Sequence, residues 1–308
     1  RLRQLDENAE IIMLERGEYI SYANCGLPYY VGGVITDKKA LQVQTVAGFR
    51  SRFRVDVRTE SEVISVDTQK KTVQVRHGGE TYEESYDKLV LSPGASPVKP
   101  PIPGMEENHV FTLRNIPDTY AIYDFIEENK PKTCVVVGAG FIGLEMAENL
   151  SERGLAVTVV EGASHVMPPI DMDMAHQVHN YIRAKGLNLY LGQTCTAMDK
   201  DGVILGNGQK IPADMVLLSI GVRPDTGFLK DSGIEMGARG EILVNEYMET
   251  SAADVYALGD AVSTFHVVSG AKVVIPLASP ANKQGRIVGD NLSGRRTAYK
   301  GSQGTSIM

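Results

Sequence analysis

Three glycines and one acid in residues 133–161 have the types and the spacing of a site that binds a dinucleotide. The stretch reads TCVVVGAGFIGLEMAENLSERGLAVTVVE, with Gly138, Gly140 and Gly143 near its start and Glu161 at its end. Glycines in this pattern permit a tight turn, let the backbone approach a pyrophosphate, and let a helix pack closely on a strand. An acid about 20 residues further on accepts hydrogen bonds from the ribose hydroxyls of adenosine.

A strand, a helix and a second strand must position these residues. Cys134–Val137 is predicted to be a buried strand, and Ala156–Val160 a second one that ends beside Glu161. The helix between them begins at the glycine turn, so its N-terminus offers free N–H groups and a positive dipole end to phosphates. Because Gly162–His165 contains no Arg or Lys to neutralise a 2′-phosphate beside the carboxylate, the sequence favours NADH and leaves NADPH as the second choice.

The three cysteines, Cys25, Cys134 and Cys195, form no CxxC or CxxxxC pair. This excludes a local redox dithiol and a zinc ribbon, and it is typical of the reducing cytoplasm. Cys25 precedes Gly-Leu-Pro, where a helix is expected to begin, and a helix N-terminus favours the reactive thiolate. From the local sequence alone, a buried cysteine that packs as a small hydrophobic residue is the stronger alternative.

The histidines predict no metal site. His176 and His179 are one helical turn apart, but no third ligand lies nearby, so we expect a solvated helix face.

Composition sets the limits of the prediction. A chain of 308 residues suits about two domains, and 43% hydrophobic and 22% charged residues are ordinary for a globular protein. The net charge of −7 argues against binding to nucleic acid or to an anionic membrane surface. No apolar run approaches the roughly 18 residues of a membrane span.

The start of the chain indicates a second nucleotide-binding unit. Arg1–Asn8 is predicted as the back half of a helix, and Glu10–Leu14 as a strand that ends beside Glu15. The glycine turn that normally precedes such a helix is absent, so we expect the first strand and phosphate loop to be missing. Further elements are expected as strands around 55–66, 72–77, 80–86 and 89–91, and as helices at 116–129 and within 276–292.

Together with the segment YALGD at 256–260, the two nucleotide units make the chain resemble the pyridine nucleotide-disulfide oxidoreductases. It is most similar to their single-cysteine branch, the coenzyme A disulfide reductases, some of which carry a rhodanese domain. Four segments carry this resemblance over residues 1–300, namely SYANCGLPY at 21–29, SPGASP at 92–97, the glycine pattern at 134–149 and residues 250–261. The first segment is the most specific, and it favours a redox role for Cys25.

The resemblance implies an α/β fold with two Rossmann-like dinucleotide-binding domains of three-layer ββα type. Residues 1–115 would form the first part of an FAD-binding domain, 116–245 an NAD(P)H-binding domain, and 246–308 the second part of the FAD-binding domain. By comparison with the family, the phosphate loop before Arg1 and the C-terminal dimerisation domain after Met308 are missing, and we expect residues 1–308 alone to bind FAD poorly.

The resemblance also implies an activity. NADH would reduce FAD, and FAD would pass electrons to Cys25, which reduces coenzyme A disulfide or a related disulfide or persulfide. The alternatives are an NADH oxidase or peroxidase of the same family, and a non-catalytic nucleotide-binding or redox-sensing module. The implied partners are coenzyme A or its disulfide and a second subunit in a full-length cytoplasmic homodimer, with no nucleic acid and no membrane.

The implied site residues fall into three groups, with no metal ligand among them. The catalytic residue is Cys25. The cofactor-binding residues are Glu15, Arg16, Val63, Ser92, Gly94, Ala95, Gly138, Gly140, Phe141, Ile142, Gly143, Glu161, Gly221, Gly259, Asp260, Leu277 and Ala278. The substrate-binding residues are Ser21, Asn24 and Asn282 for the pantetheine arm, and Arg1 with Arg54, or Arg52 in its place, for the phosphates.

Overall fold

The computed structural model describes residues 1–307, which form two compact units. Unit 1 contains Arg1–Ile20, Gln44–Ser96 and the chain from Arg223 onward. Unit 2 contains Ser21–Val43 and Pro97–Val222. The units follow packing, whereas the predicted domains follow cofactor contacts. The two divisions differ at Ser21–Val43, at residues 97–115 and at residues 223–245, and the predicted cofactor domains stay a prediction.

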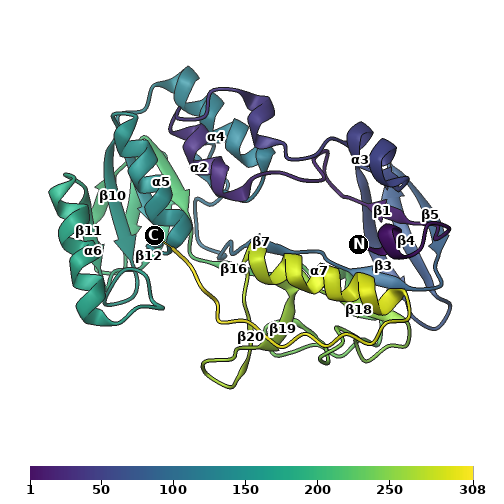
Figure 1. The fold of residues 1–308 in the computed structure, drawn as a ribbon. Coiled ribbons are helices and arrows are strands. Elements are labelled where there is room, and N and C mark those ends of the chain that lie inside the picture. Colours follow the sequence, from purple (N-terminus) through teal and green to yellow (C-terminus); the bar gives the residue numbers. More distant parts are fainter. Residues whose placement is uncertain (308) are drawn as a thin grey trace. The chain divides into compact units, whose positions relative to one another are not determined.

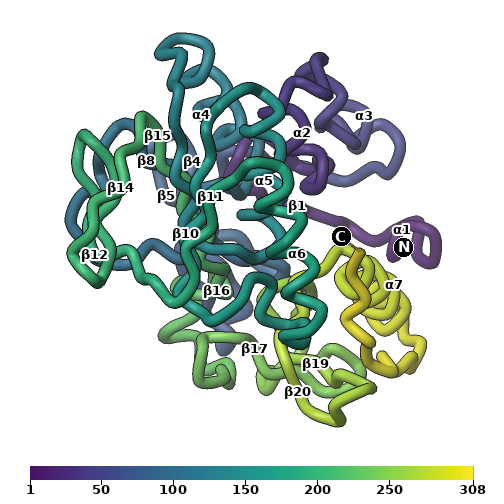
Figure 2. Tube along the Cα trace, turned by 90° about the vertical axis from the view of Figure 1, so that its left-hand side faces the viewer, coloured from purple at the N-terminus to yellow at the C-terminus, as the bar shows by residue number. Residues whose placement is uncertain are grey.

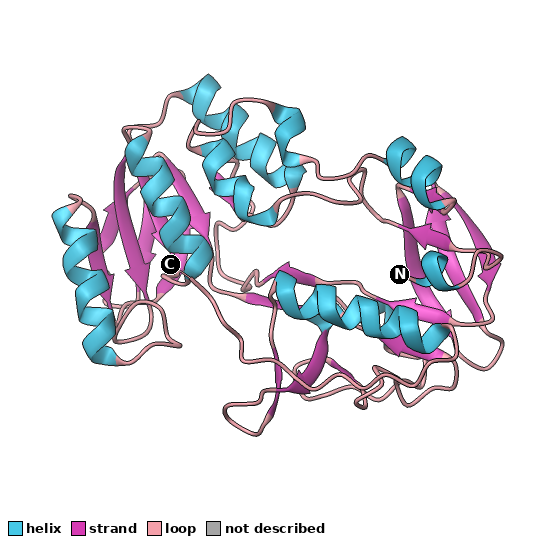
Figure 3. Ribbon diagram, in the orientation of Figure 1, coloured by secondary structure: helices cyan, strands magenta, loops and turns pink. Residues whose placement is uncertain are grey.

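Unit 2 is built on a parallel sheet with the strand order β11-β10-β9-β15-β8. Its strands are β8 (Val110–Phe111), β9 (Thr133–Val137), β10 (Ala156–Glu161), β11 (Asn188–Leu191) and β15 (Met215–Leu218). Its helices are α4 (Ile116–Asn129), α5 (Phe141–Glu152) and α6 (Met172–Ala184). Helix α5 packs on β9 and β10, and α6 packs on β11 (Figure 1; Figure 3). The central strands are apolar and buried from Cys134 to Val137 in β9 and along all of β15, because both faces are covered.

A second sheet makes unit 2 a three-layer structure. Strands β12 (Cys195–Asp199), β13 (Gly202–Leu205) and β14 (Lys210–Pro212) form an antiparallel sheet. Its buried Val203 and Leu205 share one core with Val135, Val137 and Val160 of the parallel sheet. Alternate residues of a strand face opposite sides, so β9 uses one face for this sheet and the other for helix packing. The predicted ββα layering and Rossmann-like class are confirmed.

The segment that carries Cys25 packs on helices of unit 2. It contains η1 (Asn24–Gly26), α2 (Leu27–Val31) and η2 (Lys38–Leu41). Buried Tyr30 of α2 lies 5.7 Å from Tyr120 and 5.1 Å from Tyr123 of α4, measured between ring centroids. Arg153, which follows α5, donates to the carbonyl of Val31 and lies 4.6 Å from the Tyr123 ring. These contacts fix the helix that follows Cys25.

Unit 1 combines small sheets with helices. Its helices are α1 (Leu2–Leu5), α3 (Val46–Phe53), η3 (Gly227–Leu229), η4 (Gly259–Ala261) and α7 (Ala278–Leu292). Its strand pairs and sheets are β1 (Ile12–Leu14) with β2 (Asp56–Arg58); β3 (Ser61–Asp67), β4 (Thr72–His77) and β5 (Glu80–Ser85); β6 (Leu89–Leu91) with β18 (Val255–Ala257); and β17 (Ile242–Leu243), β19 (Val262–Phe265) and β20 (Lys272–Val274). Strands β7 (Ala95–Pro97) and β16 (Val222–Pro224), which contain the points where the chain passes from one unit to the other, form a further pair. Helix α7 packs on η4, and α1 lies beside α7 (Figure 2).

Most of the predicted elements are present. The helix at 116–129 has the predicted bounds, because Asn115 and Asp118 form a capping box at its start and Lys130 takes the left-handed conformation at its end. The predicted hairpin between β4 and β5 turns through Gly78 and Gly79, both at positive φ. The predicted helix at Arg1–Asn8 is only Leu2–Leu5, because the side chain of Asp6 accepts from the backbone N–H groups of residues 8 and 9 and starts a turn.

Candidate dinucleotide site and redox thiol

The glycine turn lies between β9 and α5, and two of its glycines are required by close contacts. Gly138 has a φ of +102°, and a Cβ there would lie 2.5 Å from the carbonyl oxygen of Ser219. A Cβ on Gly143 would lie 2.0 Å from the carbonyl oxygen of Gly138. A Cβ on Gly140 would have no atom within 4 Å. The first and third glycines therefore close the turn, and the second leaves its outer side open.

The turn is placed where parallel sheets of this order bind ligands. Strand β9 lies between β10 and β15, so the connections leave it in opposite directions and a crevice forms at the carboxyl ends. Ser219, the residue after β15, closes the base of this crevice. Its N–H donates to Val137 O over 2.7 Å, and its hydroxyl donates to Gly138 O over 2.9 Å.

Glu161 is tied to the same turn. Its Oε2 accepts from the N–H of Ala139 over 2.7 Å, and its Oε1 accepts from the N–H of Ala163 over 2.8 Å. A carboxylate has about four lone-pair sites, so these two bonds leave capacity for two ribose hydroxyls. Three features therefore fit a dinucleotide: the open side of the turn at Gly140, the N-terminus of α5, and a Glu161 carboxylate that can accept further hydrogen bonds.

The other predicted contacts of this site lie close to the turn in sequence or structure. Phe141 and Ile142 form the first turn of α5, and Ile142 is 38% exposed although it is apolar. Ile220 is 42% exposed, and Gly221 beside it has a φ of +112°. Exposed apolar side chains beside a polar turn suit the planar ring of a nucleotide.

Cys25 differs from the other two cysteines in exposure. It lies in the turn η1 directly before α2 and is exposed, and all three cysteines are free thiols within residues 1–307. Burial raises the pKa of the Cys134 thiol to about 12 and also raises the pKa of Cys195. A high thiol pKa suppresses the thiolate, so the two buried or half-buried cysteines are poor nucleophiles.

In unit 1, the predicted FAD residues converge on two places. At the first, Oε1 of Glu15 accepts from the N–H of Gly17 over 2.6 Å, and Arg16 pairs with Asp225 over 2.8 Å. The hydrogen bond to Asp225 raises the pKa of the exposed Arg16. Asp225 also accepts from the hydroxyl of Ser96 over 2.9 Å. The segment at 92–97 is therefore linked to the end of β1.

The second place is the carboxyl end of the parallel pair β6 and β18. Ser92 follows β6 and Gly259 follows β18, and Leu258 N donates to Leu91 O over 3.0 Å. Gly259 N donates over 2.8 Å to the side-chain oxygen of Gln284, which is 2% exposed in α7. Sequence reasoning missed Gln284, because a buried glutamine in a helix has no motif. The same strand ends and helix hold the remaining predicted residues Gly94, Ala95, Asp260, Leu277 and Ala278.

The predicted coenzyme A contacts are distributed over both units. Ser21 and Asn24 belong to unit 2, whereas Arg1, Arg54 and Asn282 belong to unit 1. Arg1 Nε lies 2.8 Å from Asp290 Oδ1, and the Arg54 side chain is 66% exposed. The neighbouring basic cluster is partly structural, because the guanidinium of Arg3 donates to four backbone carbonyls, those of residues 6, 7, 53 and 54. Arg52 stacks its guanidinium 5.2 Å from the Phe53 ring. Val63, predicted at the adenine, is half-buried in β3.

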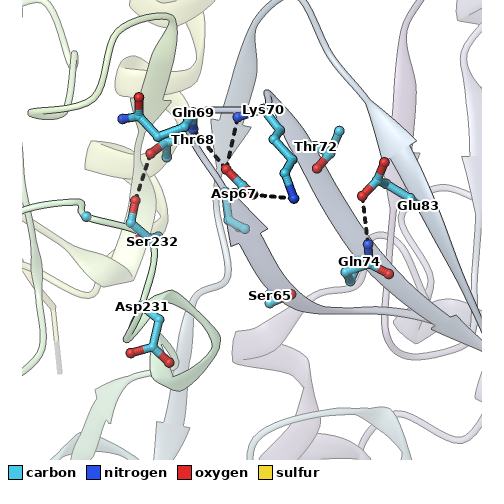
Figure 4. A pocket seen from close by; sticks show the side chains of 12 residues that line it. Ser65, Asp67, Thr68, Gln69, Lys70, Thr72, Gln74, Glu83, Asp231 and Ser232 are labelled. Carbon is cyan, nitrogen blue, oxygen red and sulfur yellow. Dashed lines mark hydrogen bonds and ion pairs between the residues drawn. The ribbon is translucent and has the colours of Figure 1, made fainter.

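A separate pocket of about 490 Å³ lies in unit 1, away from these residues in sequence (Figure 4). Several of the polar groups that line it form hydrogen bonds with one another. Asp67 accepts from the backbone of Lys70 over 2.9 Å, Thr68 donates to Ser232 O over 2.8 Å, and Gln74 contacts its neighbour on β5. These bonds hold the β3–β4 turn and the loop after η3 together, which is a structural task.

No group of three or more His, Cys, Asp or Glu side chains in residues 1–307 is arranged to hold a metal ion. Within the same residues, no helix is long and apolar enough to cross a membrane. The expected solvated face at His176 and His179 is wrong in part, because His179 is only 3% exposed and its Nε2 accepts from the N–H of Val166.

Comparison with known proteins identifies the family. The profile of the pyridine nucleotide-disulphide oxidoreductases matches residues 1–285. The whole chain is 34% identical to 70% of the coenzyme A disulfide reductase of Staphylococcus aureus (strain NCTC 8325 / PS 47). Reduced Bacillus anthracis CoADR-RHD matches 99% of the chain with a TM-score of 0.97 and 48% identity, and the NAD-dependent persulfide reductase of A. fulgidus matches 97% with a TM-score of 0.94 and 38% identity. The chain spans 56% and 57% of these two structures. It belongs to the pyridine nucleotide-disulphide oxidoreductase family.

Proposed function

We propose that this chain is the two-nucleotide part of a flavoprotein that reduces coenzyme A disulfide, or a related small disulfide or persulfide, with NADH. The observation that carries the proposal is Cys25. It is the exposed cysteine of the three, and it lies in the segment SYANCGLPY of a chain that belongs to the pyridine nucleotide-disulphide oxidoreductase family.

The site around Gly138–Glu161 would hold NADH. The turn brings the N–H groups of α5 to the pyrophosphate, and Glu161 accepts from the ribose hydroxyls while Ala139 and Ala163 keep its carboxylate in place. A 2′-phosphate would be repelled by this carboxylate, which supports NADH as the preferred reductant and NADPH as the weaker one.

The carboxyl ends of β1, β6 and β18 would hold FAD. Glu15 would accept hydrogen bonds from the ribose of FAD, and Asp260 would accept them from its ribityl chain. The backbone at Ser92–Ala95 would lie along the FAD molecule. Gly94 and Gly259 have φ of +73° and +82°, which brings bare backbone to these edges. When bound, FAD supplies the step that accepts a hydride from NADH and passes on an electron pair.

Cys25 would then perform the disulfide chemistry. Its thiolate attacks one sulfur of the substrate, so that a bond forms between Cys25 and one coenzyme A sulfur while the other coenzyme A leaves as a thiolate. The electron pair from NADH breaks this mixed disulfide and restores the Cys25 thiolate. One NADH and one proton thus convert one disulfide into two thiols and NAD⁺.

Ser21 and Asn24 beside the thiol, together with Asn282, would hold the pantetheine arm, and Arg1 and Arg54 would meet the phosphates of coenzyme A. Local cations are needed because the chain carries a net charge of −7. We further propose a cytoplasmic homodimer for the full-length protein.

A persulfide is the second candidate acceptor, and the 38% identity to a persulfide reductase favours it. Oxygen or peroxide reduction through a sulfenic acid at Cys25, and nucleotide binding without turnover, are the remaining alternatives.

The test is a Cys25→Ser variant of the full-length enzyme, assayed for NADH consumption with coenzyme A disulfide, a coenzyme A persulfide, peroxide and oxygen in turn. We expect disulfide reduction to fall to background while reduction of the flavin by NADH persists. Cys134→Ser is the matched control, because a buried thiol has no access to substrate. Substantial disulfide turnover by Cys25→Ser would refute the proposal, as would an equal loss in the control.

A further inference from the structure

The loop that follows Glu161 returns to the glycine turn. Met167 N donates to Ala139 O over 2.9 Å, while the N–H of Ala139 donates to Glu161. Val166 and Met167 are fully buried, and Met167 has a φ of +53°, in the left-handed region that disfavours residues with a side chain. The loop at 162–167, which we call the strap, therefore needs surrounding contacts to keep its arrangement.

His179 supplies one of these contacts from α6. Its ring is 3% exposed, and its Nε2 lies 3.2 Å from Val166 N, which donates to it. An imidazole nitrogen accepts a hydrogen bond only when it carries no proton, so the contact requires neutral His179 with its proton on Nδ1. Two hydrogen bonds thus connect the buried imidazole to the glycine turn. Val166 N donates to His179, and the next residue, Met167, donates to Ala139 O.

We propose that His179 is a positioning residue for the dinucleotide. In its neutral form it holds the strap against the glycine turn, so that Ala139 and Glu161 keep the arrangement that receives the adenosine ribose, and its protonation releases the strap. The inference rests on the proposed NADH site, but it is independent of Cys25 and of the acceptor.

The surroundings of His179 favour its neutral form. Burial lowers its pKa, and the positive charge of Arg183 on the same helix lowers it further, as do His176 one turn earlier and His165 in the strap. Protonation of His179 would place its Nε2–H opposite the N–H of Val166, so that two donors face each other, and it would bury a positive charge. The contact is therefore complete above the ordinary histidine value of about 6.5 and is lost as the pH falls through the lowered value.

The experiment measures NAD⁺ binding by calorimetry to the full chain at pH 8 and at the lowest pH at which its circular dichroism spectrum is still that of the folded chain, because NAD⁺ binds without turnover. We expect the unaltered chain to lose about tenfold in affinity at the lower pH, as for one lost hydrogen bond. His179→Leu should be about tenfold weaker already at pH 8, with little further change. His179→Gln can accept from Val166 but does not titrate, so it should bind well at both values. Gln177→Leu is the control, because Gln177 is exposed on the same helix and its side-chain hydrogen bond goes to Met174 and not to the strap.

Hydrogen exchange at the amides of Val166 and Met167 gives a second readout, which should quicken in His179→Leu and not in the control. The proposal is overturned if His179→Leu binds NAD⁺ like the unaltered chain at pH 8 with both amides still protected. It is also overturned if His179→Gln keeps the pH dependence of the unaltered chain, a comparison that stands even where the leucine variant does not fold. Failure of NAD⁺ to bind the unaltered chain at either pH would instead refute the dinucleotide site.

Discussion

Substituting Gly143 by alanine would place a methyl group where the glycine turn has no room for one. Its Cβ would lie 2.0 Å from the carbonyl oxygen of Gly138 and 2.5 Å from the hydroxyl of Ser219, against about 3.5 Å for an ordinary contact. The carbonyl has little freedom to move, because it accepts from that hydroxyl over 2.9 Å. The N-terminus of α5 must therefore shift away from β9 by about 1.5 Å.

The energy follows from two opposing terms. Overpacking costs typically about 1–3 kcal/mol, and the clash with backbone atoms belongs at the upper end of that range. Alanine in place of glycine in a helix recovers about 1 kcal/mol. We expect a net loss of about 2 kcal/mol, which lowers the Tm by roughly 4–8 °C. Because α5 would present its N–H groups to the pyrophosphate in the proposed NADH site, we also expect NAD⁺ affinity to fall by at least about tenfold.

Two matched variants separate the steric effect from the helix effect. Gly285→Ala in α7 changes a helical glycine whose Cβ would have no atom within 4 Å, so it should raise the Tm slightly. Gly140→Ala also has open space, and its backbone suits alanine, so it should keep the Tm but weaken NAD⁺ binding at the pyrophosphate. Melting curves and calorimetry distinguish the three. A Gly143→Ala chain with unchanged Tm and unchanged NAD⁺ affinity would show that the turn tolerates a side chain and that this reasoning fails.

The remaining predictions concern single side chains. Iodoacetamide at pH 8 should label Cys25 in the folded chain and leave Cys134, whose pKa is raised to about 12, unlabelled until denaturant is added; early labelling of the buried thiol would contradict this. We expect a higher KM for NADPH than for NADH, and Glu161→Ala should bring the two KM values closer together. An unaltered enzyme that prefers NADPH would show that the role assigned to Glu161 is wrong. Arg153→Met removes the donor to Val31 O, the last carbonyl of α2, so it should lower the free energy of unfolding by about 2 kcal/mol and slow disulfide turnover but not flavin reduction. Lys130→Met, at an exposed position, should change neither the stability nor the turnover.

Features that depend on neighbours along the chain could be predicted without the structure. The helix at 116–129 and the hairpin at Gly78 and Gly79 follow from capping and turn residues whose effects are local. The strand, glycine turn and helix around Gly138 likewise follow from residue type and spacing, as does the candidate role of Glu161 after the second strand.

Contacts between groups that are distant along the chain became known from the folded structure. Gly138 and Gly143 lack room for a side chain because Ser219, about 80 residues later, is brought beside them by β15. His179 was expected on a solvated face, but the strap folds over it and buries it. Gln284 gained a backbone partner through packing of α7 on η4. In each case the physical reason is the same: burial and hydrogen bonding are set by partners whose sequence separation no local pattern encodes.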